Sequence, residues 1–318
     1  MERSAAASAL GLSLARREGA GLGVENGSDA VRLVHGAADG FAGLTADRLG
    51  PAVLVERHDP AADAEGIIEA LARRFGAQEP IFLKERWSKE RADRAGGQVR
   101  GAACPPDILV PEQGLVFGVS LAHEEHIGLF LDARPARALV RRVAEGRRVL
   151  NLFSYTGTLG AAAAVGGALS STNVDVMRSA LATARDNYAR NGLAADTRTF
   201  LRCDVFQHLA RAARSEARCD LIVVDPPPRA ARPGRRGFDA RTGYGRLLAR
   251  CLKVLAPNGL ILAGTNLKGG GFEELEDPLA QGARLAGRNV EIVERVPAGP
   301  DFPQPSDRPA ARFVLAQA

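Results

Sequence analysis

The sequence predicts an α/β protein. Its larger part is expected to be an open, mostly parallel sheet layered with helices, and its smaller N-terminal part an α+β domain. From Arg148 onward, apolar runs of strand length alternate with helical patterns, which is the order of elements that a parallel sheet needs. Before Gly118, short β-like runs follow one another with one helical pattern among them. A chain of 318 residues is long enough for both domains.

The larger domain is expected to contain seven strands. Its first strand is a continuous apolar run, short enough to be buried on both faces of a sheet, and an alanine-rich helix over 159–165 follows it. We expect the first five strands to be parallel and the last two to close the sheet antiparallel. The predicted strands are 148–153, 171–175, 198–203, 219–224, 259–264, 289–296 and 311–316.

The N-terminal part begins with helix-forming residues over 4–17, and a glycine-rich stretch then ends that pattern. A second helical pattern spans 64–75. The β-like runs around it are 31–34, 53–56, 81–84 and 115–119. We therefore expect an N-terminal helical arm over 1–27, a small α+β domain on the substrate side over 28–120, and the large domain over 121–318.

Composition and charge restrict the class of protein. Hydrophobic residues make up 46% of the chain, so it can form a packed core. The net charge of +5 permits a polyanionic partner without requiring one. No apolar run is long enough to cross a bilayer.

Cysteine and histidine usage indicates a cytoplasmic protein without a metal site. The four cysteines are scattered and form no C-x-x-C pair, so we interpret them as reduced thiols. His123-Glu124-Glu125-His126 lacks the H-E-x-x-H spacing that puts two imidazoles on one helical face. The cysteines are Cys104, Cys203, Cys219 and Cys251.

A glycine and two aspartates follow or end three successive predicted strands of the larger domain. Gly157 lies in the turn after the first strand, Asp175 ends the second, and Asp204 follows the third. A turn glycine, a helix N-cap and a surface carboxylate would each explain one of them. Ligands of open α/β sheets bind at the carboxyl ends of the strands, where a carboxylate accepts hydrogen bonds from ribose hydroxyls. Together the three residues therefore predict a nucleoside-containing cofactor.

The fourth strand ends in Asp225-Pro226-Pro227. Proline fixes φ and lacks an N–H, so this strand ends abruptly and its last carbonyl groups can accept from a substrate. A proline-rich strand exit without a further role is the alternative. A nucleoside site beside this motif suggests methyl transfer from S-adenosylmethionine.

An arginine-rich segment over 229–246 follows the proline motif. Arginines can bind phosphates, and aromatic rings can stack on an extruded base. A solvated loop explains the composition equally well. The RNA-binding candidates are Arg229, Arg235, Arg236, Phe238 and Tyr244.

Three segments together resemble the class I large-subunit (23S) ribosomal RNA methyltransferases. They are 150–157 (LNLFSYTG), 128–134 (GLFLDAR) and 225–227 (DPP). The resemblance covers about 28–318 and implies a Rossmann-like, seven-stranded, S-adenosylmethionine-dependent methyltransferase sheet with ribosomal RNA as the partner.

The resemblance also implies roles for single residues. Asp175 would hold the ribose and Asp204 the adenine, while Asp132 and Arg134 would close over the cofactor, the arginine pairing with the methionine carboxylate. The cofactor-binding set is Asp132, Arg134, Phe153, Ser154, Tyr155, Gly157, Asp175, Asp204 and Asp225. The catalytic set is Asp225, Pro226, Pro227 and Asn266.

Two branches of this family compete, an RlmK-type branch that methylates guanine N7 and an RlmI-type branch that methylates cytosine C5. The cytosine branch is expected to carry a nucleophilic cysteine just after the fifth strand, but here 260–268 contains none and reads Thr265-Asn266 near its end. This favours guanine N7. Cytosine C5, a substrate other than RNA and a non-catalytic RNA-binding protein stay as alternatives. A dinucleotide oxidoreductase is disfavoured because the first turn is not G-x-G-x-x-G.

Overall fold

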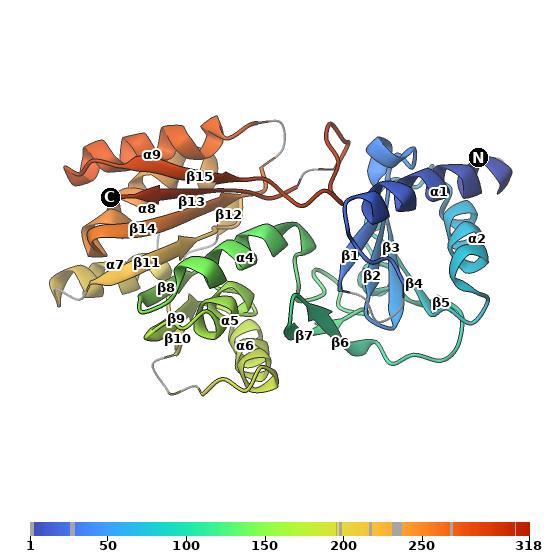
Figure 1. Cartoon of the computed structure of the whole chain (residues 1–318), viewed down its shortest axis with the longest axis horizontal. Coiled ribbons are helices and arrows are strands. Elements are labelled where there is room, and N and C mark those ends of the chain that lie inside the picture. The colour runs from blue at the N-terminus through green and yellow to red at the C-terminus, as the bar shows by residue number, and fades with distance from the viewer. Residues whose placement is uncertain are drawn as a thin grey trace. The chain divides into compact units, whose positions relative to one another are not determined.

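The computed structural model describes residues 3–25, 29–194, 196, 199–215, 218–230, 237–267, 270–308 and 310–318. It divides the chain into two compact units (Figure 1). Unit 1 comprises residues 1–132 and 299–309, and unit 2 comprises 133–298 and 310–318. The chain therefore leaves unit 1 once, returns to it near the C-terminus and then completes unit 2.

Unit 1 contains a five-stranded sheet in the order β1-β2-β3-β4-β5. Strands β3 and β4 are parallel and the other neighbours are antiparallel. Helix α2 forms the crossover connection between β3 and β4. The hairpin β6–β7 forms a separate two-stranded sheet. The elements are α1 (Arg3–Gly19), β1 (Val31–His35), η1 (Gly36–Asp39), β2 (Leu44–Leu49), β3 (Ala52–Arg57), α2 (Ala64–Phe75), β4 (Ile81–Glu85), α3 (Arg91–Ala95), β5 (Gly97–Arg100), β6 (Asp107–Glu112) and β7 (Leu115–Ser120).

The predicted division at residue 27, with a separate N-terminal helical arm, is wrong. Helix α1 belongs to unit 1. Its apolar side chains Leu10 and Leu14 are buried in one core with Leu33 of β1 and Leu71 of α2. Burial of this apolar face makes the helix part of unit 1.

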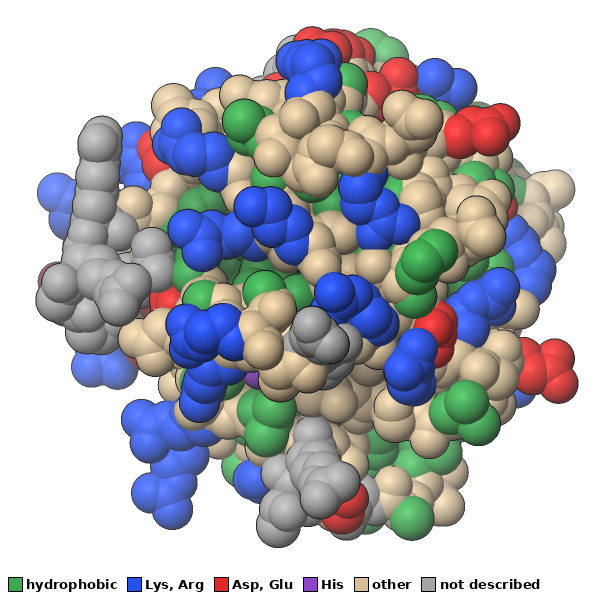
Figure 2. All heavy atoms as spheres, turned by 90° about the vertical axis from the view of Figure 1, so that its left-hand side faces the viewer, with side chains coloured by type: hydrophobic (Ala, Val, Ile, Leu, Met, Phe, Trp, Pro, Cys, Tyr) green, Lys and Arg blue, Asp and Glu red, His purple; other side chains and the backbone are tan. Residues whose placement is uncertain are grey.

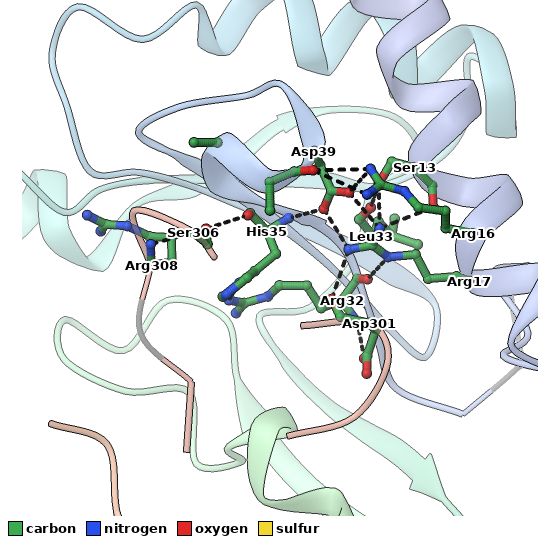
Figure 3. A network of polar contacts seen from close by, with 12 residues as sticks. Ser13, Arg16, Arg17, Arg32, Leu33, His35, Asp39, Asp301, Ser306 and Arg308 are labelled. Carbon is green, nitrogen blue, oxygen red and sulfur yellow. Dashed lines mark hydrogen bonds and ion pairs between the residues drawn. The ribbon is translucent and has the colours of Figure 1, made fainter. Parts of the chain in front are cut away.

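The returning segment 299–309 is joined to unit 1 by buried charges (Figure 3). The Arg17 guanidinium donates to both carboxylate oxygens of Asp39, at 2.8 and 2.6 Å, and at 2.8 Å to the carbonyl oxygen of Asp301. The Arg32 main-chain N–H donates at 3.0 Å to Oδ2 of Asp301. Arg17, Asp39 and Asp301 are all buried, so this fully paired network fixes the segment against α1 and β1.

Unit 2 is built on a seven-stranded sheet in the order β10-β9-β8-β11-β14-β16-β15. The first five strands are parallel, while β16 is antiparallel to both β14 and β15. This confirms the predicted fold class and the antiparallel closure. The strands are β8 (Arg148–Leu152), β9 (Ser170–Asp175), β10 (Phe200–Arg202), β11 (Cys219–Val224), β14 (Leu255–Thr265), β15 (Glu291–Val296) and β16 (Arg312–Gln317).

Helices cover both faces of this sheet. One face packs against α4 and α5, and the other against α7, α8 and α9, each with its own apolar core. The helices are α4 (Arg134–Val143), α5 (Thr158–Val165), α6 (Arg178–Arg190), α7 (Val205–Arg214), α8 (Ala240–Val254) and α9 (Glu273–Ala286), with η2 (Leu131–Ala133) before α4. No helix in the described ranges is long and apolar enough to span a membrane.

Strand β8 lies between β9 and β11, and the chain winds outward from it first to β9 and β10 and later to β11 and β14. At such a reversal of strand order the loops on either side diverge and leave a crevice at the carboxyl ends of the strands. This edge of the sheet carries the predicted cofactor residues from Phe153 to Asp225.

Candidate functional site

The turn after β8 has an unusual backbone. Phe153 and Tyr155 have φ values of 56° and 48°, in the left-handed region that residues other than glycine rarely adopt. Hydrogen bonds hold the turn in this shape. The Ser154 N–H donates at 3.1 Å to the Val174 carbonyl, and the Tyr155 N–H at 2.8 Å to Oδ2 of Asp175. Such over-determined backbone is typical of binding sites.

Gly157 completes the turn and is the N-cap of α5, with φ at 70°. A Cβ atom at this position would lie 2.8 Å from the Cβ of Ala184 in α6. Glycine is therefore required twice, by the left-handed backbone and by the close packing of α6 on the turn.

Ser154 has the one feature of this turn that calls for a ligand. Its side chain is 7% exposed, and its hydroxyl Oγ has no hydrogen-bond partner in the part of the chain that the structure describes. A buried hydroxyl without a partner is costly, so a polar ligand group in the crevice would satisfy it. The turn thus fits a cofactor that carries polar groups.

Asp175 ends β9 beside this turn and is partly exposed. Its Oδ2 accepts from the Tyr155 N–H, and its Oδ1 accepts at 2.9 Å from the Met177 N–H. These bonds fix the carboxylate. A carboxylate has about four acceptor positions, so it still has the capacity to bind ribose hydroxyls.

Asp204 lies on the same edge, because the Cys203 N–H donates at 3.0 Å to the Asp175 carbonyl. Its Oδ1 caps α7 by accepting at 3.0 Å from the Gln207 N–H. The N-cap role considered for Asp204 is therefore present, and a contact with adenine would be an additional role.

Asp225 follows β11, with Pro226 buried and Pro227 exposed after it. Its carboxylate lies over the neighbouring strand, since a Cβ atom on Gly264 would fall 2.7 Å from Oδ1 of Asp225. The backbone of Gly264 leaves the space that this carboxylate occupies. Asn266 follows β14 and is exposed.

Phe238 and Tyr244 do not lie where base stacking would need them, and this expectation is corrected. They are 7% and 3% exposed and belong to the core between the sheet and α8. The Tyr244 hydroxyl contacts the Val224 carbonyl oxygen at 2.9 Å and that of Gly264 at 2.7 Å. Tyr244 therefore joins the ends of β11 and β14 directly before Asp225 and Thr265.

Within the arginine-rich segment the structure describes residues 229–230 and 237–246. Arg229–Ala230 (β12) pairs with Phe238–Asp239 (β13), and Arg229 is exposed with its Nε 3.4 Å from Oδ2 of Asp239. Arg235 and Arg236 lie outside the described residues.

Asp132 and Arg134 fall in different units. Asp132 belongs to η2 in unit 1 and is partly buried, whereas Arg134 begins α4 in unit 2 and is 4% exposed. Their closure over a cofactor stays a prediction.

A buried amide network under the turn was missed in the sequence. The Asn151 side chain donates at 2.9 Å to Oδ1 of Asn173, whose amide donates at 2.8 Å to the Tyr188 hydroxyl. Asn187 donates at 3.0 Å to the Thr156 carbonyl, within the turn itself. Asn151 inside the apolar run of β8 was the available signal, because a buried amide must have partners.

Comparisons with known proteins agree with this geometry. A family model described as S-adenosylmethionine-dependent methyltransferase matches residues 77–315. Ribosomal RNA large subunit methyltransferase I of Shewanella amazonensis is 33% identical over 285 residues, which are 88% of this chain and 71% of that protein. Ribosomal RNA large subunit methyltransferase of Deinococcus radiodurans is 32% identical over 269 residues, which are 82% of this chain and 65% of that protein. The crystal structure of SMU.776, solved with SAH, has a TM-score of 0.87 at 24% identity, covering 100% of this chain and 82% of that one.

Proposed function

The chain belongs to the S-adenosylmethionine-dependent methyltransferase family, and from this premise we propose that it methylates a base of large-subunit ribosomal RNA. The observation that supports cofactor binding is the turn after β8. There Ser154 has a buried hydroxyl without a partner among the described residues, beside the fixed carboxylate of Asp175. The names of the relatives and the net charge of +5 support RNA as the substrate.

The cofactor site combines a fixed turn with one fixed carboxylate. S-adenosylmethionine supplies, when bound, an electrophilic methyl group on a sulfonium. Asp175 would accept the ribose hydroxyls, and Ser154 would donate or accept through its Oγ. Because the N–H groups of Tyr155 and Met177 already hold the Asp175 carboxylate, this acceptor needs little reordering when the cofactor binds.

The acceptor base would lie at the ends of β11 and β14. Asp225, Pro226 and Pro227 follow β11, and Asn266 follows β14. Asn266 and the Asp225 carboxylate would orient the base by hydrogen bonds to its edge, and the prolines would keep the strand end rigid. Placement in line with the methyl group would then account for catalysis.

The positions of the four cysteines favour an acceptor atom that can be methylated without a covalent bond between a thiol and the base. Cys251 is fully buried in α8, and burial raises the pKa of Cys219 to about 11. Cys219 begins β11 and so lies about 20 Å of strand before Asp225. Cys203 follows β10, three strand positions or about 14 Å from β11. Cys104 belongs to unit 1, and burial raises its thiol pKa as well.

Guanine N7 is the acceptor atom that this arrangement supports best. N7 has an in-plane lone pair and needs neither a thiolate nor removal of a proton. In an A-form helix the major groove is too narrow for a methyl donor to reach N7, so the target guanine must be unstacked or extruded.

Cytosine C5 is the second candidate. The name ribosomal RNA large subunit methyltransferase I, carried by relatives of this chain, is that of the cytosine branch. Methylation of C5 would require one of the four cysteines to attack C6.

Methyl transfer in vitro tests this proposal. Purified protein with radiolabelled S-adenosylmethionine and deproteinised large-subunit ribosomal RNA should label the RNA, and digestion should place the label in 7-methylguanosine. Label in 5-methylcytidine would select the second candidate. RNA without label, while the protein binds S-adenosylmethionine, would contradict an RNA substrate.

A further inference from the structure

Helix α8 presents a row of three cations along one side. Arg246, Arg250 and Lys253 are exposed and spaced four and three residues apart, so they lie on one face of the helix. They line an open groove together with side chains of α7, α8 and α9, namely Leu209, Ala210, Ala213, Ala249 and Leu285. Figure 2 shows the end of unit 2 where α7 and α9 finish, and most of the charged side chains on this face are Lys and Arg.

Within the part of the chain that the structure describes, these three cations have no carboxylate partner. In the described ranges none of them forms an ion pair, and only Arg250 has a ring contact, 5.9 Å from the centre of Phe206. Some other arginines of unit 2 are paired with acids, as Arg148 is with Asp220 at 2.8 Å. The three charges of this row are not neutralised by acids of the described chain.

The helix itself gains little from this arrangement. Like charges four residues apart repel one another and destabilise a helix. Lys253 lies in the last turn of α8, where the helix dipole favours a cation, but Arg246 lies near the middle of the helix, where it does not. A polyanion in the groove would remove the repulsion between all three charges.

Arg246 is the groove residue of α8 nearest to the reaction edge, and the groove extends from it toward the ends of α7 and α9. Tyr244 fixes the first turns of α8 to the ends of β11 and β14, and Arg246 follows it by two positions. At about 1.5 Å of rise per residue, the cations from Arg246 to Lys253 extend over about 10 Å, away from that edge. The small side chains of Ala210, Ala213 and Ala249 leave room for a strand to lie close to the helices.

We infer that this groove binds the phosphate backbone of the RNA substrate, as a contact site outside the catalytic edge. The inference rests on the proposed RNA substrate. Arginine and lysine are the usual ligands of RNA phosphates, and three such contacts contribute affinity without sequence preference. The target base would occupy the reaction edge while its flanking strand follows α8.

A salt titration of RNA binding tests the inference. The probe is deproteinised large-subunit ribosomal RNA, and the variant is the triple substitution Arg246→Ala, Arg250→Ala and Lys253→Ala. The slope of log K against log salt should become shallower by about 2, because each lost contact to a single strand removes about 0.7. S-adenosylmethionine affinity should stay unchanged. The double variant Arg246→Ala and Lys253→Ala keeps the ring contact of Arg250 and should show about two thirds of that change in slope.

Two control variants separate this groove from a general effect of charge. Arg73→Ala, Lys89→Ala and Arg94→Ala remove the same charge from unit 1 and should change the slope by less than half as much. Arg246→Lys and Arg250→Lys keep the charge and should keep the slope. Equal effects of both triple variants, or an unchanged slope in the groove variant, would overturn the inference, and an acidic protein would then be the occupant to test. A wild-type protein that binds no RNA would instead contradict the proposed function.

Discussion

The main-chain N–H of Tyr155 donates a hydrogen bond of 2.8 Å to Oδ2 of Asp175 and so joins the turn after β8 to the carboxylate at the end of β9. The two residues are twenty positions apart. Tyr155 follows β8 and Asp175 ends β9, and these two strands are parallel neighbours. Because the bond holds the left-handed backbone of Tyr155 and orients the carboxylate at once, the shape of the turn and the position of the ribose acceptor depend on each other.

Asp175→Ala should weaken S-adenosylmethionine binding by about 10- to 100-fold, the loss expected for hydrogen bonds to a charged group. Isothermal titration calorimetry measures it. Asp186→Ala removes an exposed carboxylate of α6 and should leave the affinity unchanged. Native affinity in a folded Asp175→Ala protein would show that this carboxylate does not hold the cofactor.

Gly157→Ala should reduce both stability and cofactor affinity. The added methyl group requires an unfavourable φ of 70° and approaches Ala184 to 2.8 Å, so we expect a loss of about 1–3 kcal/mol in the free energy of unfolding. Gly192→Ala is the matched control, since it has φ at 67° and open space around its Cβ. Urea denaturation of both variants compares the two costs, and equal losses would mean that packing on α6 contributes nothing.

Tyr244→Phe should impair methyl transfer more than cofactor binding. The variant keeps the buried ring and removes the hydroxyl that joins the Val224 and Gly264 carbonyls, at a cost of about 1–3 kcal/mol in stability. These carbonyls directly precede Asp225 and Thr265, so the acceptor side of the site should lose its order. Single-turnover rates and calorimetry measure the two effects, and a normal rate in the variant would contradict this positioning role.

Unit 1 should lose stability as the pH falls from 6.5 toward 4. Burial lowers the pKa of His35 to about 4 and that of His58 to about 3, so both stay neutral in the folded protein. The unfolded chain takes up protons near pH 6.5, and it binds more protons than the folded state below that value. Stability therefore decreases with decreasing pH, by about 2 kcal/mol for each histidine at pH 5.

Denaturant titrations at pH 7 and pH 5 measure this loss. The double variant His35→Gln and His58→Gln has no proton to take up at these positions and should show a smaller difference between the two pH values. An equal difference in the variant and the wild type would assign the pH dependence to other groups.

The sequence predicted the sheet of unit 2 well because its inner strands β8, β11 and β14 are largely buried and read as apolar runs. Strand β2 was missed for the opposite reason. Its residues Asp47 and Arg48 are charged but buried, since Asp47 pairs with Arg32 at 2.6 Å and Arg48 pairs with Glu79. Charge pairing between distant segments leaves no periodic signal in the sequence.

The return of 299–309 to unit 1 could not be predicted for the same reason, because its contacts with Arg17 and Arg32 span more than 260 residues. Tyr244 was misplaced because arginines surround it in the sequence. Its spacing from Leu247, Leu248 and Cys251 puts it on the buried face of α8, and that periodicity was the better guide.

The central claim is that this chain methylates a base of large-subunit ribosomal RNA. Mass spectrometry of nucleosides from the large-subunit RNA of the host, with and without the gene, tests it most directly. We predict that one 7-methylguanosine disappears without the gene, returns with the wild-type gene and does not return with Asp175→Ala. An unchanged set of methylated nucleosides would contradict the claim, and loss of a 5-methylcytidine instead would move the acceptor to cytosine C5.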